Sequence, residues 1–177
     1  RWGNIINPSD VVDKHGADTL RMYEMFMGPL TDTKPWDTKG EQGVFRFINK
    51  VWNLQFKVAE ISNEGQSREA ARLTSKVEEG IENLSFNTSV AKFMEFSNFL
   101  QKQEVIAKDV WENFLLILSP FAPFITEELW SRLGHSASIH TQTWPEYDSK
   151  LLQEDRVTIV VQINGKIRDT LEVAAST

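Results

Sequence analysis

Residues 38–62 read TKGEQGVFRFINKVWNLQFKVAEIS, and this stretch decides the fold class. Its apolar residues recur every three or four positions, which places their side chains on one face of an α-helix. The face consists of Phe47, Val51, Leu54, Val58 and Ile61, and Phe56 is among the residues that widen it. The stretch therefore predicts one long amphipathic helix with its apolar face in a core.

The same spacing occurs on both sides of this stretch. It predicts further helices over residues 8–15, 17–27, 68–84, 86–101, 104–118 and 124–133. Isolated helices of this length are marginal in water, so their apolar faces must pack against one another. We therefore expect a mainly α protein whose body is a helical bundle.

The C-terminal residues follow a different pattern. Residues 157–163, VTIVVQI, are rich in β-branched side chains and are typical of a strand. Asn164 and Gly165 form a favoured hairpin turn, and residues 166–173 return as a second strand. Because an isolated hairpin is barely stable in water, we expect this short C-terminal β-hairpin to begin a further domain.

The composition excludes several classes of protein. The chain has 177 residues, 41% of them hydrophobic and 25% charged, and it contains no cysteine, which rules out a disulfide scaffold and a thiol nucleophile. No apolar run approaches the roughly 20 residues that span a bilayer, and the three histidines lack the spacing of metal ligands. We expect no catalytic residue, no metal and no membrane partner. The first residue is not Met, which indicates a piece of a longer protein.

The net charge of −6 argues against indiscriminate binding of nucleic acid, DNA included, but leaves room for a local basic surface. Residues 44–59 form such a region, because they contain Arg46, Lys50 and Lys57 and no acid, with Asn49 beside them. A row of cations on a rigid helix can follow a nucleic-acid backbone, since each cation neutralises a phosphate and releases a counterion. The alternative is a solvated helix face without a partner.

Two further cations lie just after the expected hairpin turn. Lys166 and Arg168 alternate along one strand, so we expect them on the same side, where they could contact phosphates. The alternative is a charged strand that blocks pairing at the sheet edge.

Six motifs follow one another along the chain. They are GADTLR (16–21), YEMFMGPL (23–30), KPW (34–36), SPFAPF (119–124), EELW (127–130) and VQINGKIRD (161–169). In this order they resemble the leucyl-tRNA synthetase family, which belongs to the class I aminoacyl-tRNA synthetases. The first motif is shared with the isoleucine, valine and methionine enzymes, whereas the second is more particular to the leucine enzyme. The resemblance covers essentially the whole chain.

The resemblance implies a division of the chain and a partner. Residues 1–36 would end the catalytic region and contact the tRNA stem, and residues 37–145 would form the anticodon-binding helical bundle. Residues 146–156 would be a linker, and residues 157–177 would begin a C-terminal domain. The implied partner is tRNA(Leu). The full-length enzyme would lie in the cytoplasm and join leucine to tRNA(Leu) through leucyl-adenylate, with ATP and Mg²⁺.

The catalytic motifs of the family are absent from the chain. It lacks the His-Ile-Gly-His motif and the editing domain, and only Gly3 and Asn4 remain of the nucleotide-binding loop. We therefore expect the isolated chain to hold no cofactor and to form no adenylate. Two alternatives stay open. One is a non-catalytic helical module that binds a protein through Trp36 and Trp144, and the other is the same region of an isoleucyl- or valyl-type synthetase.

Overall fold

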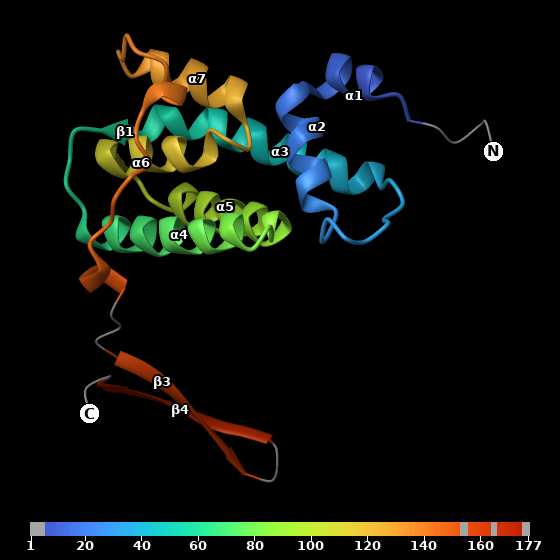
Figure 1. Ribbon diagram of the computed structural model, residues 1–177. Helices are drawn as coiled ribbons and strands as arrows, with labels where there is room; N and C mark the ends of the chain where they lie inside the picture. Colours follow the sequence, from blue (N-terminus) through green and yellow to red (C-terminus); the bar gives the residue numbers. More distant parts are fainter. Residues whose placement is uncertain (1–5, 153–155, 164–165, 175–177) are drawn as a thin grey trace.

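The computed structural model describes residues 6–152 with their side chains, and residues 156–163 and 166–174 by their backbone. Seven α-helices occur in this part of the chain (Figure 1). They are α1 (Pro8–His15), α2 (Ala17–Phe26), α3 (Thr38–Leu54), α4 (Glu64–Glu82), α5 (Phe86–Gln101), α6 (Lys108–Leu118) and α7 (Pro123–Arg132). The prediction of a mainly α protein is confirmed. None of these helices is long and apolar enough to cross a membrane.

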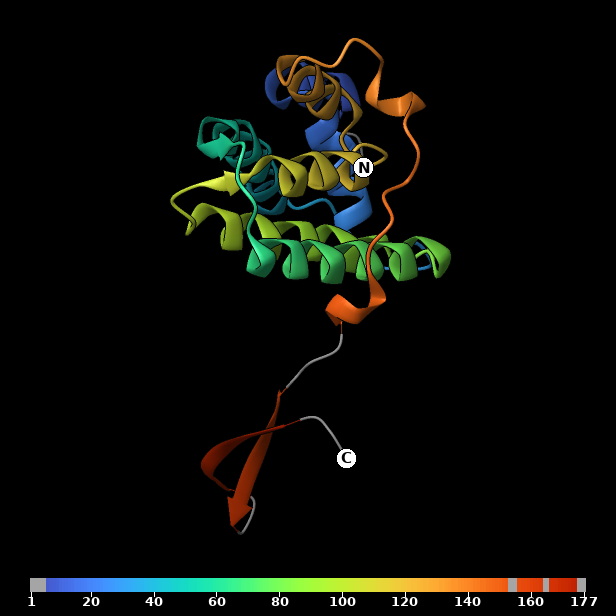
Figure 2. The ribbon, with the colours of Figure 1, turned by 90° about the vertical axis from the view of Figure 1, so that its left-hand side faces the viewer.

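The helices are stacked in layers. α4 and α5 lie side by side, α3 and α6 lie above them, and α7 covers the top, while α1 and α2 pack at one end (Figures 1 and 2). The core between these layers is apolar and contains a cluster of aromatic rings. The ring of Phe93 lies 6.2 Å from that of Phe114 and 5.0 Å from that of Phe121, and Trp111 is fully buried. Such rings bury large apolar areas and dominate the stability of a core.

Asp18 joins the N-terminal helices to the bundle. Its side chain on α2 is buried and accepts hydrogen bonds from the backbone N–H of Phe124 (3.3 Å) and Ile125 (2.7 Å). These donors belong to the first turn of α7, where N–H groups have no partner in their own helix. Burial raises the pKa of the Asp18 carboxyl, and the two hydrogen bonds oppose that rise. Asp18 thus caps α7 from another helix and fixes α2 against the bundle.

The helix predicted over residues 38–62 ends at Leu54, so the prediction of its last two turns is wrong. The chain continues as a 3₁₀ turn, η1 (Gln55–Lys57), and a short strand, β1 (Val58–Ala59). β1 pairs in parallel with β2 (Ile106–Ala107). Two side chains expected in the core are therefore exposed, Ile61 by 42% and Phe56 by 75%.

The side chain of Gln66 fixes the segment that leads from α5 through β2 into α6. It is buried on α4, where its amide donates to the Val105 carbonyl (2.8 Å) and accepts from the Ala107 N–H (2.9 Å). These bonds satisfy backbone groups that a helix would otherwise use. As a result, α6 begins at Lys108 and not at Glu104 as predicted.

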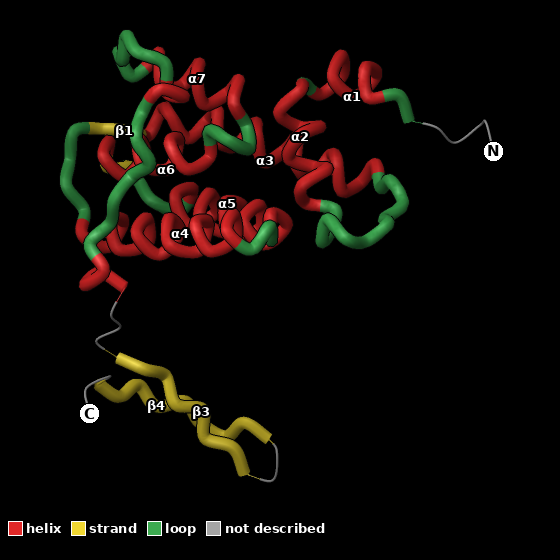
Figure 3. Tube along the Cα trace, viewed as in Figure 1, coloured by secondary structure: helices red, strands yellow, loops and turns green. Residues whose placement is uncertain are grey.

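The predicted C-terminal hairpin is present as β3 (Arg156–Ile163) and β4 (Lys166–Ala174) (Figure 3). The two strands are antiparallel, and Ile163 pairs with Lys166. The turn residues Asn164 and Gly165 lie outside the described residues. Figures 1 and 2 show the hairpin apart from the helices.

Candidate nucleic-acid interface

The outer side of α3 carries cations that have no acidic partner. Lys39, Arg46 and Lys50 are separated by seven and four residues, so they share one side of the helix. Lys39 and Arg46 are exposed and Lys50 is partly buried, and within residues 6–152 none of the three forms an ion pair. We call this surface the α3 cationic face, and it consists of Lys39, Arg46, Asn49, Lys50 and Asn53.

The one carboxylate of α3 lies away from this face. Glu41 is 3% exposed and contacts the Nδ1 atom of His15 on α1. Because a buried carboxylate requires such a partner, Glu41 serves the packing of α1 on α3. The cations on the outer side are therefore not neutralised from within their own helix.

Lys50 connects the face to α5. Its ammonium group donates to the side-chain oxygen of Asn98, which lies on the exposed side of α5. An amide oxygen satisfies one donor without cancelling the charge, and a lysine carries three donors. Lys50 thus keeps its positive charge at the junction of the two helices.

Lys57 has a structural partner at the end of α5. Its Nζ atom donates to the carbonyls of Gln101 (2.7 Å) and Gln103 (2.8 Å). The last carbonyls of a helix lack partners within the helix and carry its negative dipole end, so a cation stabilises them. Lys57 therefore holds η1 against α5, and the phosphate contact that the sequence predicts for it stays a prediction.

The two asparagines of the face bond to their own helix. The Asn49 side chain donates to the Phe45 carbonyl (2.9 Å), and the Asn53 side chain donates to the Asn49 carbonyl (2.8 Å). Both residues are exposed. Each amide uses one of its two N–H donors in this bond, so one donor and the oxygen acceptor remain for a ligand such as a ribose hydroxyl or a phosphate.

Two cations that sequence reasoning missed extend the surface. Lys39 lies seven residues before Arg46, and this spacing would have revealed it. Lys102 lies in the sequence between Gln101 and Gln103, whose carbonyls bind Lys57. It is exposed and forms no ion pair within the described residues. Lys102 comes close to the end of α3 only because the helices pack together, so the local sequence could not predict this position.

The remaining predicted site residues lie outside what the structure describes. Gly3 and Asn4 belong to residues 1–5, and the side chains of Lys166 and Arg168 are not described. The backbone register does place Arg168 at an irregularity, because Gln162 pairs with Ile167 and Val161 pairs with Asp169. The regular alternation assumed for Lys166 and Arg168 is therefore interrupted.

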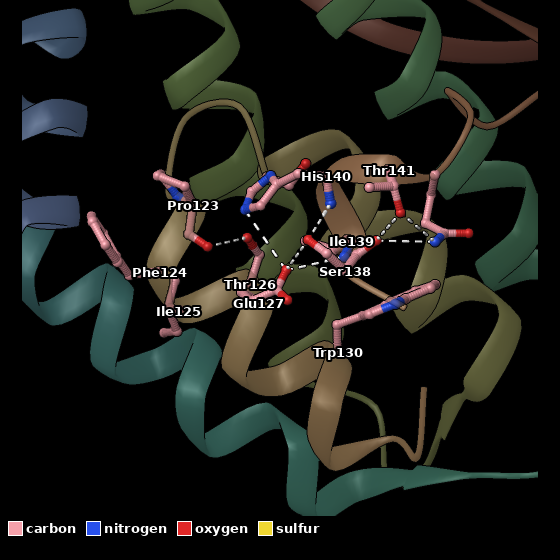
Figure 4. A network of polar contacts seen from close by, with 12 residues as sticks. Pro123, Phe124, Ile125, Thr126, Glu127, Trp130, Ser138, Ile139, His140 and Thr141 are labelled. Atoms are coloured by element: carbon pink, nitrogen blue, oxygen red, sulfur yellow. Dashed lines mark hydrogen bonds and ion pairs between the residues drawn. The ribbon is translucent and has the colours of Figure 1, made fainter. Parts of the chain in front are cut away.

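A second polar cluster closes the loop after α7 (Figure 4). The Glu127 carboxylate accepts from the Ser138 hydroxyl (2.9 Å) and the Ile139 N–H (3.0 Å), and His140 Nε2 lies 3.8 Å from it. The Trp130 indole donates to the Ala137 carbonyl (3.2 Å). These bonds tie the loop to α7, which is a structural task. No group of three or more potential metal ligands occurs among the described residues.

Both tryptophans of the protein-binding alternative are engaged inside the fold. The Trp36 ring packs edge-on against Tyr23, with centroids 4.7 Å apart. The Trp144 indole donates to the Glu78 carboxylate at 2.7 Å. Both side chains are partly buried, so neither forms a free aromatic anchor.

Comparison with known proteins identifies the class. Residues 67–177 match the family model described as the anticodon-binding domain of tRNA ligase. This match covers more than half of the chain. The chain therefore belongs to the anticodon-binding domain family of tRNA ligases.

Relatives narrow this assignment to the leucine branch. The chain is 47% identical over 173 residues to the leucine–tRNA ligase of Borreliella burgdorferi (strain ZS7), a match that covers 95% of this chain and 20% of that protein. It is 46% identical to the leucine–tRNA ligase of Borrelia garinii subsp. bavariensis, with 98% and 21% covered. The resemblance to leucyl-tRNA synthetases is confirmed. The chain spans about a fifth of the length of these relatives.

A solved structure shares the fold. It is the LeuRS of Agrobacterium radiobacter K84 (agnB2) in a ternary complex with tRNA and LeuAMS. The TM-score is 0.81 at 28% sequence identity, and the match covers 99% of this chain and 25% of that one. The helical arrangement described above is thus that of a region of a leucyl-tRNA synthetase.

Proposed function

We propose that this chain is the tRNA-docking part of a leucyl-tRNA synthetase and that the α3 cationic face binds phosphates of tRNA(Leu). The observation that carries the proposal is that Lys39, Arg46 and Lys50 share one side of α3 and have no carboxylate partner within residues 6–152. An exposed cation without a counter-charge gains most when a phosphate replaces its condensed counterions.

The shape of RNA fits this kind of contact. A-form RNA hides its base edges in a deep groove, so a helix that meets a duplex reads its backbone and its shape. The overall charge of −6 repels a polyanion from most of the surface. A local cationic face therefore orients the RNA as well as attracting it.

The whole protein would perform the chemistry of its relatives. We propose that it joins leucine to tRNA(Leu) through leucyl-adenylate in the cytoplasm, with ATP and Mg²⁺. Within this chain, Gly3 and Asn4 would belong to the nucleotide-binding loop. Residues 1–36, 37–145, 146–156 and 157–177 would serve as the end of the catalytic region, the bundle, a linker and the start of a C-terminal domain. Lys166 and Arg168 would add contacts to the tRNA.

The direct test is a titration of the chain with tRNA(Leu) and with a non-cognate tRNA at two salt concentrations. We expect affinity to fall steeply as salt rises, because phosphate contacts release counterions. We also expect tRNA(Leu) to bind more tightly than the non-cognate tRNA. Equal affinity at both salt concentrations would contradict the proposal.

A separate assay addresses the division between docking and chemistry. The purified chain should show no leucine-dependent exchange of pyrophosphate into ATP, because the loop lysines that offset charge in the transition state are absent. Clear exchange by the purified chain would show that it carries its own catalytic site.

A further inference from the structure

Phe56 is the most exposed large apolar side chain of the described residues, at 75%. A buried phenylalanine side chain stabilises a fold by removing apolar surface from water, so this exposed position gives up that stabilisation. Phe56 lies on η1, directly after α3 ends at Leu54, so it follows the end of α3 that carries Asn53 of the α3 cationic face.

The backbone on both sides of Phe56 is fixed. The preceding residue, Gln55, donates its side-chain amide to the Trp52 carbonyl at 2.8 Å. The following residue, Lys57, donates to the carbonyl of Gln101, which is the last residue of α5, and to the carbonyl of Gln103 just beyond it. Directly after η1, Val58 pairs with Ile106. An outward ring on such an anchored turn is preorganised, and little conformational freedom is lost when something binds it.

The charges around Phe56 select the chemistry of its occupant. The nearest cation is Lys57 itself, whose two hydrogen bonds place the end of α5 beside the turn, whereas Arg46 lies roughly 15 Å further back along α3 at 1.5 Å per residue. Lys102 lies between the two carbonyls that hold Lys57. Two acids also lie near the turn: Glu60, which pairs with Lys108 at 2.6 Å, and Glu104, two residues after Lys102. Lys102 forms no ion pair within the described residues, so a phosphate beside the ring would be bound there. A nucleotide combines an anionic phosphate with a flat base, and single-stranded RNA is commonly held by cations together with stacked aromatic rings.

We propose that Phe56 is a stacking platform for an unpaired base of the bound tRNA, next to the phosphates held by the α3 cationic face. The inference rests on the proposed function and adds to it a base that is not paired within a duplex. The ring gives no hydrogen-bond readout, so the contact accepts any base and favours a loop or a bulge over a stem.

The test compares three substitutions in the full chain, with tRNA(Leu) as the probe. Phe56→Ala should weaken binding about tenfold, within the range known for the loss of a base–aromatic stack. Phe56→Leu, which keeps an apolar side chain without a ring, should weaken it to a similar extent. Phe56→Trp should bind at least as tightly as the parent. The slope of affinity against salt should not change, because no cation is lost.

Two controls make the test specific. Phe124 is 67% exposed at the start of α7, so Phe124→Ala removes a similarly exposed ring from another helix and should leave binding unchanged. A fully paired RNA duplex offers no free base, so the parent and Phe56→Ala should bind it equally.

The possible results separate the two proposals. Binding by Phe56→Ala within twofold of the parent, or parent-like binding by Phe56→Leu, overturns the stacking platform. If Arg46→Ala flattens the salt slope in the same experiment, the α3 cationic face still binds phosphates even though Phe56 does not stack on a base. Absence of any tRNA binding by the parent chain overturns both.

Discussion

α3 and α4 carry similar cations but surround them differently. On α4, each cation has a carboxylate nearby: Arg68 lies 3.4 Å from Glu64, Arg72 2.6 Å from Glu69, and Lys76 2.9 Å from Glu79. On α3, no carboxylate pairs with the three cations of the outer side in the described part of the chain. The number of positive residues on a helix therefore does not identify a binding surface. What identifies it is whether those residues have carboxylates beside them.

The physical consequence concerns competition for the cation. A phosphate that approaches α4 must displace a carboxylate that is already close, and it also meets the excess acids of that helix. A phosphate that approaches the α3 cationic face displaces only diffuse counterions. An acidic protein can thus keep one side of a helix ready for RNA: the carboxylate of Glu41 is buried against His15, and that of Asp37 caps the start of α3.

The largest effect should come from removing the unpaired cations together. Replacing Lys39, Arg46 and Lys102 by alanine should lower the affinity for tRNA(Leu) about 100-fold at 0.1 M salt, because each lost phosphate contact accounts for several-fold. The matched control replaces Arg68, Arg72 and Lys76 on α4, and its affinity should stay within about threefold of the parent. Equal losses of affinity in both triple variants, measured by filter binding, would show that cations with and without carboxylate partners contribute alike to RNA binding.

The next effect concerns Lys57, the cation that bonds to α5. Lys57→Ala should lower the free energy of unfolding by about 1–3 kcal/mol, because two carbonyls lose a charged donor. Urea unfolding followed by circular dichroism measures this loss. Lys102→Ala is the control, since Lys102 is exposed and makes no ion pair within residues 6–152, and its stability should change by less than about 0.5 kcal/mol. If Lys57→Ala keeps the parental stability but binds tRNA more weakly, Lys57 contacts RNA and does not stabilise the fold.

A third experiment makes α3 resemble α4. Gln42→Glu introduces a carboxylate four residues before Arg46, the favoured arrangement for an ion pair on a helix. The affinity for tRNA(Leu) should fall about fivefold, because the pair neutralises Arg46, while stability should rise by a few tenths of a kcal/mol. Gln42→Leu controls for the loss of the amide. Unchanged affinity in Gln42→Glu would show that Arg46 does not meet a phosphate.

The smallest effect should come from the Lys76–Glu79 pair on α4. Its hydrogen bond and charge lower the pKa of Glu79 below the ordinary value of 4.5 and raise the pKa of Lys76. A lowered acid pKa stabilises the fold above pH 4.5, and this contribution is lost as the pH falls through the lower folded value. Both side chains are largely exposed, so Glu79→Gln should flatten the pH dependence only slightly in thermal unfolding. A large change in the pH dependence would show that the exposed ion pairs of α4 contribute substantially to stability.

Much of the fold was accessible from the sequence. Every expected helix is present, and the strand pattern of residues 157–163 did predict β3. Two boundaries differ for different reasons: α4 begins at Glu64 and not at residue 68, because the Asn63 side chain caps it locally, whereas the end of α3 depends on distant segments. α3 ends at Leu54 because the next residues bond to distant segments, through Lys57 to α5 and through β1 to β2. Local periodicity contains no information on such partners, and for the same reason it placed Phe56 in the core.

The candidate site was less accessible. The acid-free stretch that contains Arg46 and Lys50 was visible in the sequence, and the structure adds that these two residues remain unpaired with carboxylates in residues 6–152. The sequence did not reveal that Lys57 caps α5 or that Lys102 lies beside it. Both facts depend on how α3 crosses α5, which is decided by packing in the core.

Whether the α3 cationic face docks RNA can be read from the slope of log affinity for tRNA(Leu) against log salt concentration, measured for the parent, Arg46→Ala and Lys76→Ala. Arg46→Ala should reduce the slope by about 0.9, the value expected for one lost phosphate contact, while Lys76→Ala should leave it unchanged. If Arg46→Ala keeps the parental slope, or if both variants reduce it equally, the α3 cationic face is not the surface that docks RNA.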